Sequence, residues 1–179
     1  DIHASTAKEI FNLKDSEINN DFRRKAKAIN FGILYGISPY GLAKQLAITN
    51  SQAKEYINEY FKKYPKIKKY MDHQIDFAKT NQFVETIFKR KININGITDK
   101  NFAVRGFAER QAINAPIQGS AADIIKLAMI EIHKEIKVKN IEAKMLLQVH
   151  DELIFEVESS KFDNLVSNVK TIMESIHLK

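Results

Sequence analysis

The run Arg23–Gly36, RRKAKAINFGILYG, constrains this chain more than any other segment. Two cations, Arg23 and Lys27, are followed by two aromatic residues, Phe31 and Tyr35, at intervals of four residues. On a helix each step of four advances about 40° beyond a full turn, so the four side chains lie within about 120° of one another. The spacing therefore predicts a helix that carries cations at the start of one face and rings at its end.

The cations of this run fall where a helix dipole disfavours them. Four lie close to the expected N-terminus: Arg23, Arg24, Lys25 and Lys27. Each opposes the dipole by up to ~1 kcal/mol, but together they deepen a positive end whose free N–H groups already attract anions. Arg23 and Phe31 are about 12 Å apart along the axis, and a nucleoside triphosphate has the matching layout of a polyanion and a stacking base. The alternative is a solvated basic helix whose rings pack into a core.

Composition limits the class of protein. The 179 residues are 44% hydrophobic and 28% charged, with a net charge of +6, which supports one or two small domains with cores and suits a phosphate-rich partner. The absence of cysteine excludes a disulfide framework and a thiolate metal site. No apolar run approaches the ~18 residues of a membrane span, and the first residues do not resemble a signal peptide, so the cytoplasm is the expected location.

The first eighty residues or so have the apolar spacing and start signals of helices. The expected helices run from Ser5 or Thr6 to Leu13, from about Asp21 to Tyr35 with Asn20 or Asp21 as the cap, from Pro39 to Leu46, from a cap at Asn50 or Ser51 to Tyr64, and from Pro65 to about Thr80. These helices form a predicted helical subdomain.

The pattern changes after this point. The segment 83–97 alternates and is rich in β-branched residues, which predicts a small hairpin. The further expected elements are a helix from Asn101 to Asn114, an interruption at Pro116, a helix from Gln118 to Lys137, two strands within Lys144–Val157 joined by a tight turn at His150-Asp151, and a helix from Ser159 or Ser160 to about His177. Together with the helical part, they predict an α+β fold.

The tight turn is a second candidate site. It places His150, Asp151 and Glu152 between two apolar strands, where an acidic pair has no packing role. Exposed carboxylates on a rigid turn are the hard oxygen ligands that Mg²⁺ prefers, and phosphoryl transfer uses two such ions about 3.5–4 Å apart. Such a pair of ions needs carboxylates from more than one segment. The alternative is an ordinary polar β-turn.

A third group lies on the helix around Pro116. Arg110, Asn114 and Gln118 are again four residues apart. Guanidinium and amide groups hydrogen-bond to phosphates, sugars and base edges, so these side chains are candidates for nucleic-acid contact. Taken alone, the group is better explained as a polar helix face.

The three groups together resemble one family, the A-family DNA polymerases to which bacterial DNA polymerase I belongs. Arg23–Gly36 resembles the nucleotide-binding helix of that family, and QVHDE at 148–152 resembles its second catalytic carboxylate motif. RQAINAPIQGSAADIIK at 110–126 is similar to its segment that touches primer and template. DIHASTA at 1–7 resembles the stretch just after its first catalytic carboxylate motif. The resemblance covers nearly the whole chain, in order.

The resemblance implies an activity and a division of the chain. The activity is template-directed DNA synthesis, in which a primer 3′-OH attacks the α-phosphorus of a dNTP and pyrophosphate leaves, with two Mg²⁺ ions in the complete active site. Residues 1–20 would be the entry segment from palm to fingers, residues 21–82 the helical fingers, and residues 83–179 part of the palm with the catalytic hairpin.

The resemblance also implies residue roles. The nucleotide would be bound by His3, Arg23, Lys27, Phe31 and Tyr35. Primer or template would be contacted by Arg110, Asn114, Gln118 and His150. Asp151 and Glu152 would bind Mg²⁺, and the catalytic residues would be Asp151, Glu152 and Lys27. In this family phenylalanine at the position of Phe31 is associated with discrimination against dideoxynucleotides, because it lacks a hydroxyl that could replace a missing 3′-OH.

Two departures from the family pattern matter. Lys89 and Asn95 stand where the family usually shows the glycine of a Gly-Arg-Arg turn and then a proline, which puts the local hairpin in question. The first catalytic aspartate is expected upstream of Asp1, so the chain by itself is expected to be inactive. The alternative function is therefore a non-catalytic nucleotide- and DNA-binding module. The unpaired edge of the Lys144–Val157 hairpin would also favour a dimer or aggregation.

Overall fold

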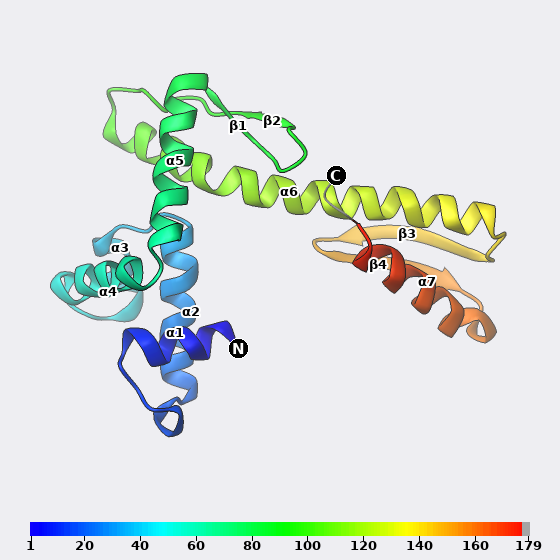
Figure 1. Cartoon of the computed structure of the whole chain (residues 1–179), viewed down its shortest axis with the longest axis horizontal. Coiled ribbons are helices and arrows are strands. Elements are labelled where there is room, and N and C mark those ends of the chain that lie inside the picture. Colours follow the sequence, from blue (N-terminus) through cyan, green and yellow to red (C-terminus); the bar gives the residue numbers. More distant parts are fainter. Residues whose placement is uncertain (177–179) are drawn as a thin grey trace. The chain divides into compact units, whose positions relative to one another are not determined.

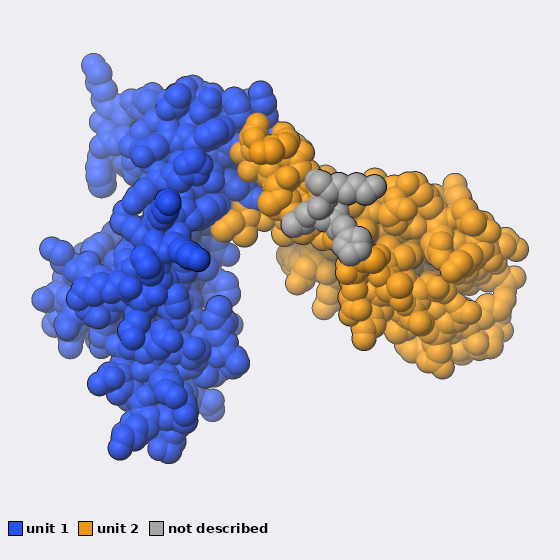
Figure 2. Space-filling model, in the orientation of Figure 1, with its two compact units in different colours: residues 1–84, 91–116 blue, residues 85–90, 117–179 orange. Residues whose placement is uncertain are grey.

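The computed structural model describes residues 1–176, which form helices and two small two-stranded sheets (Figure 1). The α+β class expected from the sequence is confirmed. The chain divides into two compact units, coloured separately in Figure 2. Unit 1 comprises Asp1–Val84 and Lys91–Pro116, and unit 2 comprises Glu85–Arg90 and the stretch from Ile117 onward. This division does not test the expected boundaries of fingers and palm, which stay a prediction.

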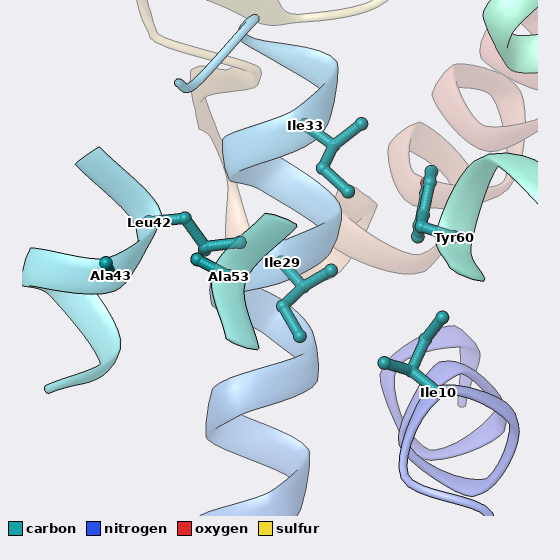
Figure 3. Packing of buried hydrophobic residues seen from close by; sticks show 7 residues of the cluster. All are labelled: Ile10, Ile29, Ile33, Leu42, Ala43, Ala53 and Tyr60. Atoms are coloured by element: carbon teal, nitrogen blue, oxygen red, sulfur yellow. The ribbon is translucent and has the colours of Figure 1, made fainter. Parts of the chain in front are cut away.

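Five helices and a short 3₁₀ turn make up the first part of unit 1. They are α1 (Ile2–Ile10), the 3₁₀ turn Asp15–Glu17, α2 (Asn20–Leu34), α3 (Pro39–Leu46), α4 (Asn50–Lys63) and α5 (Pro65–Asn81). Seven buried residues from α1 to α4 form its main hydrophobic core, shown in Figure 3: Ile10, Ile29, Ile33, Leu42, Ala43, Ala53 and Tyr60. Because Ile29 and Leu42 are fully buried, this core fixes α2 against its neighbours.

The caps of these helices differ from those expected. The first helix begins at Ile2, not at Ser5 or Thr6, because the Asp1 carboxylate accepts from two free N–H groups of its first turn. Asn19, and not Asn20 or Asp21, caps α2 in the same way. The fourth helix is capped by Thr49, whose hydroxyl forms a capping box with Gln52, and not by Asn50 or Ser51.

The first hairpin pairs β1 (Phe83–Glu85) with β2 (Lys91–Asn93). Its turn closes through a hydrogen bond from the Thr86 N–H to the Arg90 carbonyl (3.0 Å). Lys89 lies in this turn with φ at 64°, in the left-handed region that favours glycine. The hairpin is thus present despite the departure noted above, and a lysine takes the backbone conformation for which a glycine is suited.

A single helix, α6 (Phe102–Val138), runs through Pro116, where the sequence predicted an interruption between two helices. Proline lacks the N–H that would bond to the carbonyl four residues earlier and weakens the preceding turn. In that turn the Tyr70 hydroxyl on α5 donates to the Ile113 carbonyl (3.0 Å). The carbonyl that loses its helix donor at Pro116 is that of Ala112, so Tyr70 bonds to the next residue of the weakened turn and links it to α5. The expected interruption is wrong.

The second hairpin pairs β3 (Ala143–Val149) with β4 (Glu152–Val157) in antiparallel register, with Val149 opposite Glu152. A two-residue turn, His150-Asp151, joins them, as the sequence predicted. The 3₁₀ turn Ser159–Lys161 and α7 (Phe162–Glu174) follow. Neither serine caps α7, which has no side-chain cap, so that expectation is wrong. The expected helix end at His177 lies outside the described residues.

Candidate functional site

The second helix has one buried and one exposed face. Its buried residues are Ala26, Ile29, Asn30 and Ile33. Arg23, Lys27, Phe31 and Tyr35 are all exposed, with 42% of Phe31 and 46% of Tyr35 accessible. The alternative in which these rings pack into a core therefore does not hold. Two large exposed rings beside two cations form a surface that can accept a ligand.

The exposed rings and cations are close enough to act on one ligand. The rings of Phe31 and Tyr35 are nearly parallel, at 14°, with centroids 6.1 Å apart. The His3 ring of α1 lies 5.6 Å from that of Phe31, and Lys27 Nζ lies 5.9 Å from the same ring. The structure thus brings His3 of α1 to the face of α2 that carries Lys27 and Phe31.

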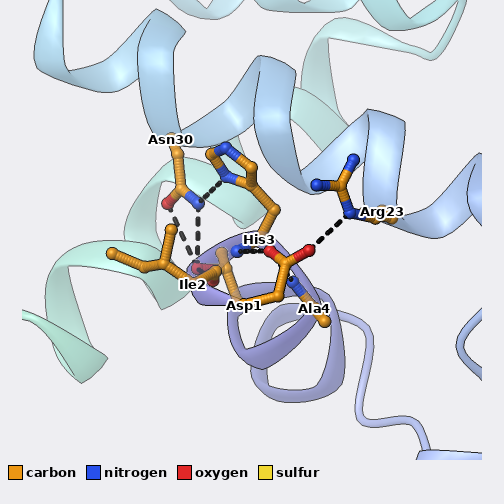
Figure 4. A network of polar contacts seen from close by, with 7 residues as sticks. Asp1, Ile2, His3, Ala4, Arg23 and Asn30 are labelled. Carbon is orange, nitrogen blue, oxygen red and sulfur yellow. Dashed lines mark hydrogen bonds and ion pairs between the residues drawn. The ribbon is translucent and has the colours of Figure 1, made fainter. Parts of the chain in front are cut away.

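A polar network ties the start of α1 to α2 (Figure 4). One carboxylate oxygen of Asp1 accepts from the His3 N–H (2.8 Å) and the Ala4 N–H (3.3 Å). The other lies 2.6 Å from Arg23 Nε in an ion pair. Asp1 therefore both caps α1 and orients Arg23, a role that the sequence did not indicate because the partner is 22 residues away.

A buried part of this network contacts His3. The amide nitrogen of Asn30 lies 3.1 Å from His3 Nδ1 and 3.0 Å from the Thr6 hydroxyl. Asn30 is 6% and Thr6 1% exposed. Sequence reasoning missed both residues, although an asparagine on the apolar face of an amphipathic helix is a signal of a buried hydrogen bond.

The charges around His3 act on its ring. Burial lowers the pKa of His3 below 6.5, and the positive charges of Arg23, Lys27 and the N-terminal amine lower it further. The ring is therefore neutral at neutral pH, and it can donate one hydrogen bond and accept one.

Unit 1 also contains a cleft of about 910 Å³ at the C-terminal end of α2. Its lining includes Phe31, Tyr35, Gly36 and Arg110. A Cβ added at Gly36, where φ is 69°, would lie 2.8 Å from Arg110 Cγ, so the glycine permits both the left-handed turn and the approach of this side chain. The cleft thus joins the aromatic end of α2 to the first residue of the third predicted group.

The third group does not lie in one unit. Arg110 and Asn114 belong to unit 1, and Gln118 belongs to unit 2. Arg110 and Gln118 are exposed and Asn114 is half-buried. Arg110 also lies with its guanidinium carbon 6.0 Å from the centre of the Phe107 ring.

The acidic turn lies in unit 2, and its side chains are exposed. His150 takes a left-handed backbone (φ 53°), which places Asp151 and Glu152 at the end of the β3–β4 hairpin. The Gln148 side chain donates to the His150 carbonyl (2.7 Å) and steadies the turn. Among residues 1–176, no group of three or more His, Cys, Asp and Glu side chains is arranged to hold a metal ion. The turn therefore offers two carboxylates and not a full ligand set.

Comparison with known proteins decides the family. The profile of DNA polymerase family A matches residues 1–179. The chain belongs to DNA polymerase family A. It is 49% identical over 175 residues to DNA polymerase I of Caldicellulosiruptor bescii, which covers 98% of the chain and 21% of that protein. It is 48% identical over 174 residues to DNA polymerase I of Bacillus caldotenax, covering 97% of the chain and 20% of that protein. The resemblance drawn from the motifs is thus confirmed.

A solved structure of the family agrees with the fold. The chain is similar to the POL domain of Pol1 from M. smegmatis, solved in a complex with DNA primer-template and dNTP. The TM-score is 0.90 at 39% identity, over 97% of this chain and 30% of that one. The chain spans about a fifth of the length of the curated family A relatives it matches. In residues 1–176, no helix combines the length and the apolar character needed to cross a membrane.

Proposed function

We propose that this chain is the nucleotide-binding and partial palm region of a template-directed DNA polymerase. The observation that carries the proposal is the exposed face of α2, on which Lys27 and Phe31 lie beside His3 and Arg23. Within this proposal residues 1–20 are the entry segment, residues 21–82 the fingers and residues 83–179 part of the palm. The expected cytoplasmic location stays a prediction.

The proposed nucleotide site uses charge at one end and stacking at the other. Arg23 and Lys27 bind the triphosphate by charge-assisted hydrogen bonds, and His3 donates a further one. Phe31 stacks on the sugar and base, and Tyr35 lies near the templating base at the cleft. The dNTP named in the M. smegmatis complex supports this class of ligand.

The proposed DNA contacts come from the residues around Pro116 and the acidic turn. Arg110, Asn114, Gln118 and His150 hydrogen-bond to primer or template near the primer terminus. The net charge of +6 favours such a polyanionic partner. The primer-template DNA in the M. smegmatis complex supports the same partner.

Asp151 and Glu152 are the proposed magnesium ligands. Two exposed carboxylates on a turn steadied by Gln148 fit a hard cation in ligand chemistry, and they would supply part of its coordination. When bound, Mg²⁺ neutralises charge on the phosphates during displacement. Lys27 is the third proposed catalytic residue. Its ammonium group on α2 binds the negatively charged phosphates directly, without a metal ion between them.

A second candidate function is a nucleotide- and DNA-binding module without catalysis. The two-carboxylate turn favours it, because phosphoryl transfer with two ions needs more ligands than this turn supplies. Primer extension separates the two candidates. We expect the isolated chain to give little or no Mg²⁺-dependent extension. Extension that is lost in Asp151→Ala but kept in Asp163→Ala, an exposed carboxylate on α7, would refute the module.

Nucleotide binding tests the proposed function itself. Lys27→Ala is expected to weaken dNTP binding by roughly 10- to 100-fold, the effect of one hydrogen bond to a charged group. Lys25→Ala is the matched control, since Lys25 pairs with Asp21 and points away from the exposed rings. Calorimetric titration of the chain with a dNTP measures both. Equal losses of dNTP affinity in the two variants would mean that only the net charge of the chain matters, which would contradict the proposed site.

A further inference from the structure

The amide of Asn30 has a defined set of partners. Its nitrogen carries two hydrogens and has two neighbours at hydrogen-bond distance, the Thr6 hydroxyl at 3.0 Å and His3 Nδ1 at 3.1 Å. Because Asn30 is 6% exposed, both hydrogens need these partners. The arrangement is complete only if both the Thr6 oxygen and His3 Nδ1 accept.

The Thr6 hydroxyl can accept from the Asn30 amide. It has one hydrogen and two acceptors within reach, the Ile2 carbonyl at 2.9 Å and Asn30 Oδ1 at 3.2 Å. With its hydrogen on either of them, the Thr6 oxygen keeps a lone pair that accepts from the Asn30 nitrogen at 3.0 Å. In the structure the other side of that nitrogen faces His3, so His3 Nδ1 is an acceptor and carries no hydrogen.

We propose that Asn30 is a positioning residue for His3, which it holds in the neutral form with its hydrogen on Nε2. A neutral imidazole that accepts at Nδ1 has its only N–H on the opposite side of the ring. His3 then offers the triphosphate a fixed neutral donor near the cations Arg23 and Lys27. This inference rests on the proposed function, and it adds a residue from the buried face of α2 to the nucleotide site.

The electrostatic surroundings agree with a neutral donor. Burial and the cations that face His3 lower its pKa, so the ring is not protonated at both nitrogens at neutral pH. The groups that act on it are Arg23 and Lys27 from α2 and the N-terminal amine from α1. A neutral ring has two possible forms, and the Asn30 contact at Nδ1 selects between them.

The first test needs no nucleotide. Nitrogen NMR of the histidine ring, assigned with His3→Gln, shows which nitrogen carries the hydrogen in the whole chain above pH 7. We expect Nε2 in the wild type. Asn30→Asp keeps the shape but replaces the donor by an acceptor, so the hydrogen is expected to move to Nδ1. Asn20→Asp adds the same charge at an exposed position of the same helix and is expected to change nothing.

A second variant tests the inference if Asn30→Asp does not fold. Thr6→Val keeps the shape of the side chain and removes the hydroxyl that hydrogen-bonds to the Asn30 amide. We expect the fraction of His3 with its hydrogen on Nε2 to fall. Wild-type His3 with the hydrogen on Nδ1, or variants that leave the ring unchanged, would overturn the inference.

Binding separates this inference from the proposed function. Relative to Asn20→Asp, Asn30→Asp is expected to weaken dNTP binding roughly tenfold, as one hydrogen bond to a charged ligand is lost. A wild-type chain that binds no dNTP would contradict the proposed function, while the NMR result would stand. A wild type that binds, with equal affinity in the two variants, would overturn the role of Asn30 and leave the function intact.

Discussion

In unit 1, one face of α2 packs against α1, α3 and α4 and places Ile29 and Ile33 in a closed core. In unit 2, by contrast, the hairpin β3–β4 and α7 leave many apolar side chains exposed. Ile29 is fully buried, while Leu146 and Ile154 are 52% and 41% exposed. Burial of apolar area is the main source of stability. We infer that the helix proposed to bind the nucleotide is held by its own unit, and that the acidic turn belongs to a less stable unit.

Two matched truncations test this difference most strongly. Ile29→Ala is expected to lower the free energy of unfolding by about 3 kcal/mol, because it leaves a cavity in a closed core. Ile154→Ala is expected to cost about 1 kcal/mol or less, because the side chain is already partly in water.

Tyrosine fluorescence during urea unfolding measures unit 1 alone. All six tyrosines lie in residues 35–70, and the chain has no tryptophan. Ile29→Ala is expected to move this transition and Ile154→Ala to leave it in place. A larger shift from Ile154→Ala would reverse the comparison between the units.

Self-association tests the exposed strand edge of unit 2. In β3 the five residues from Met145 to Val149 carry no charge that would oppose edge-to-edge pairing, although the register shifts between Met145 and Leu147. We expect the chain to dimerise or aggregate at high concentration, as the sequence predicted. Leu146→Lys is expected to weaken this association in size-exclusion chromatography. Ile130→Lys, at an exposed apolar position of α6, is the control. A clean monomer at high concentration would count against the prediction.

A substitution in the turn between β1 and β2 is expected to have a smaller, local effect on stability. Lys89 has φ at 64°, which costs a residue with a Cβ roughly 1 kcal/mol. Lys89→Gly is expected to stabilise the β1–β2 hairpin by up to about 1 kcal/mol, and Lys91→Gly, in the neighbouring strand, to destabilise it. Hydrogen exchange of the β1–β2 amides measures both. Loss of protection in Lys89→Gly would show that the lysine is not strained.

The pH dependence of unit 1 is the smallest expected effect. His3 has a lowered pKa in the folded state, so the unfolded chain binds its proton first as the pH falls through 6.5. The stability that His3 contributes is therefore full above pH 6.5, and it is lost as the pH falls through the folded pKa. His3→Gln is expected to remove this part of the pH dependence in tyrosine-detected unfolding. An unchanged profile would mean that His3 is not desolvated by its surroundings.

Local signals predicted much of this fold. Pro39 and Pro65 each open a helix where the sequence indicated, and the turn His150-Asp151 joins two strands as expected. These features depend on backbone preferences of single residues or of short patterns. The exposed face of α2 was also predictable, because helical spacing alone determines which side chains share a face.

Features that depend on distant partners were missed. The bond from Tyr70 to α6 joins residues that are 43 positions apart. Asn30 and His3 are 27 residues apart, and no local pattern relates them. A sequence shows which residues are suited to bind a nucleotide, but the residues that orient them are found only when two helices pack.

The central claim is that the exposed face of α2 binds a nucleotide within unit 1. The most direct measurement is an NMR titration of the whole chain with a dNTP, followed at the backbone amides. We expect the largest shifts at the amides from Arg23 to Tyr35 and at His3, with the amides of α7 unchanged. Shifts confined to unit 2, or no shifts at millimolar dNTP, would contradict the claim.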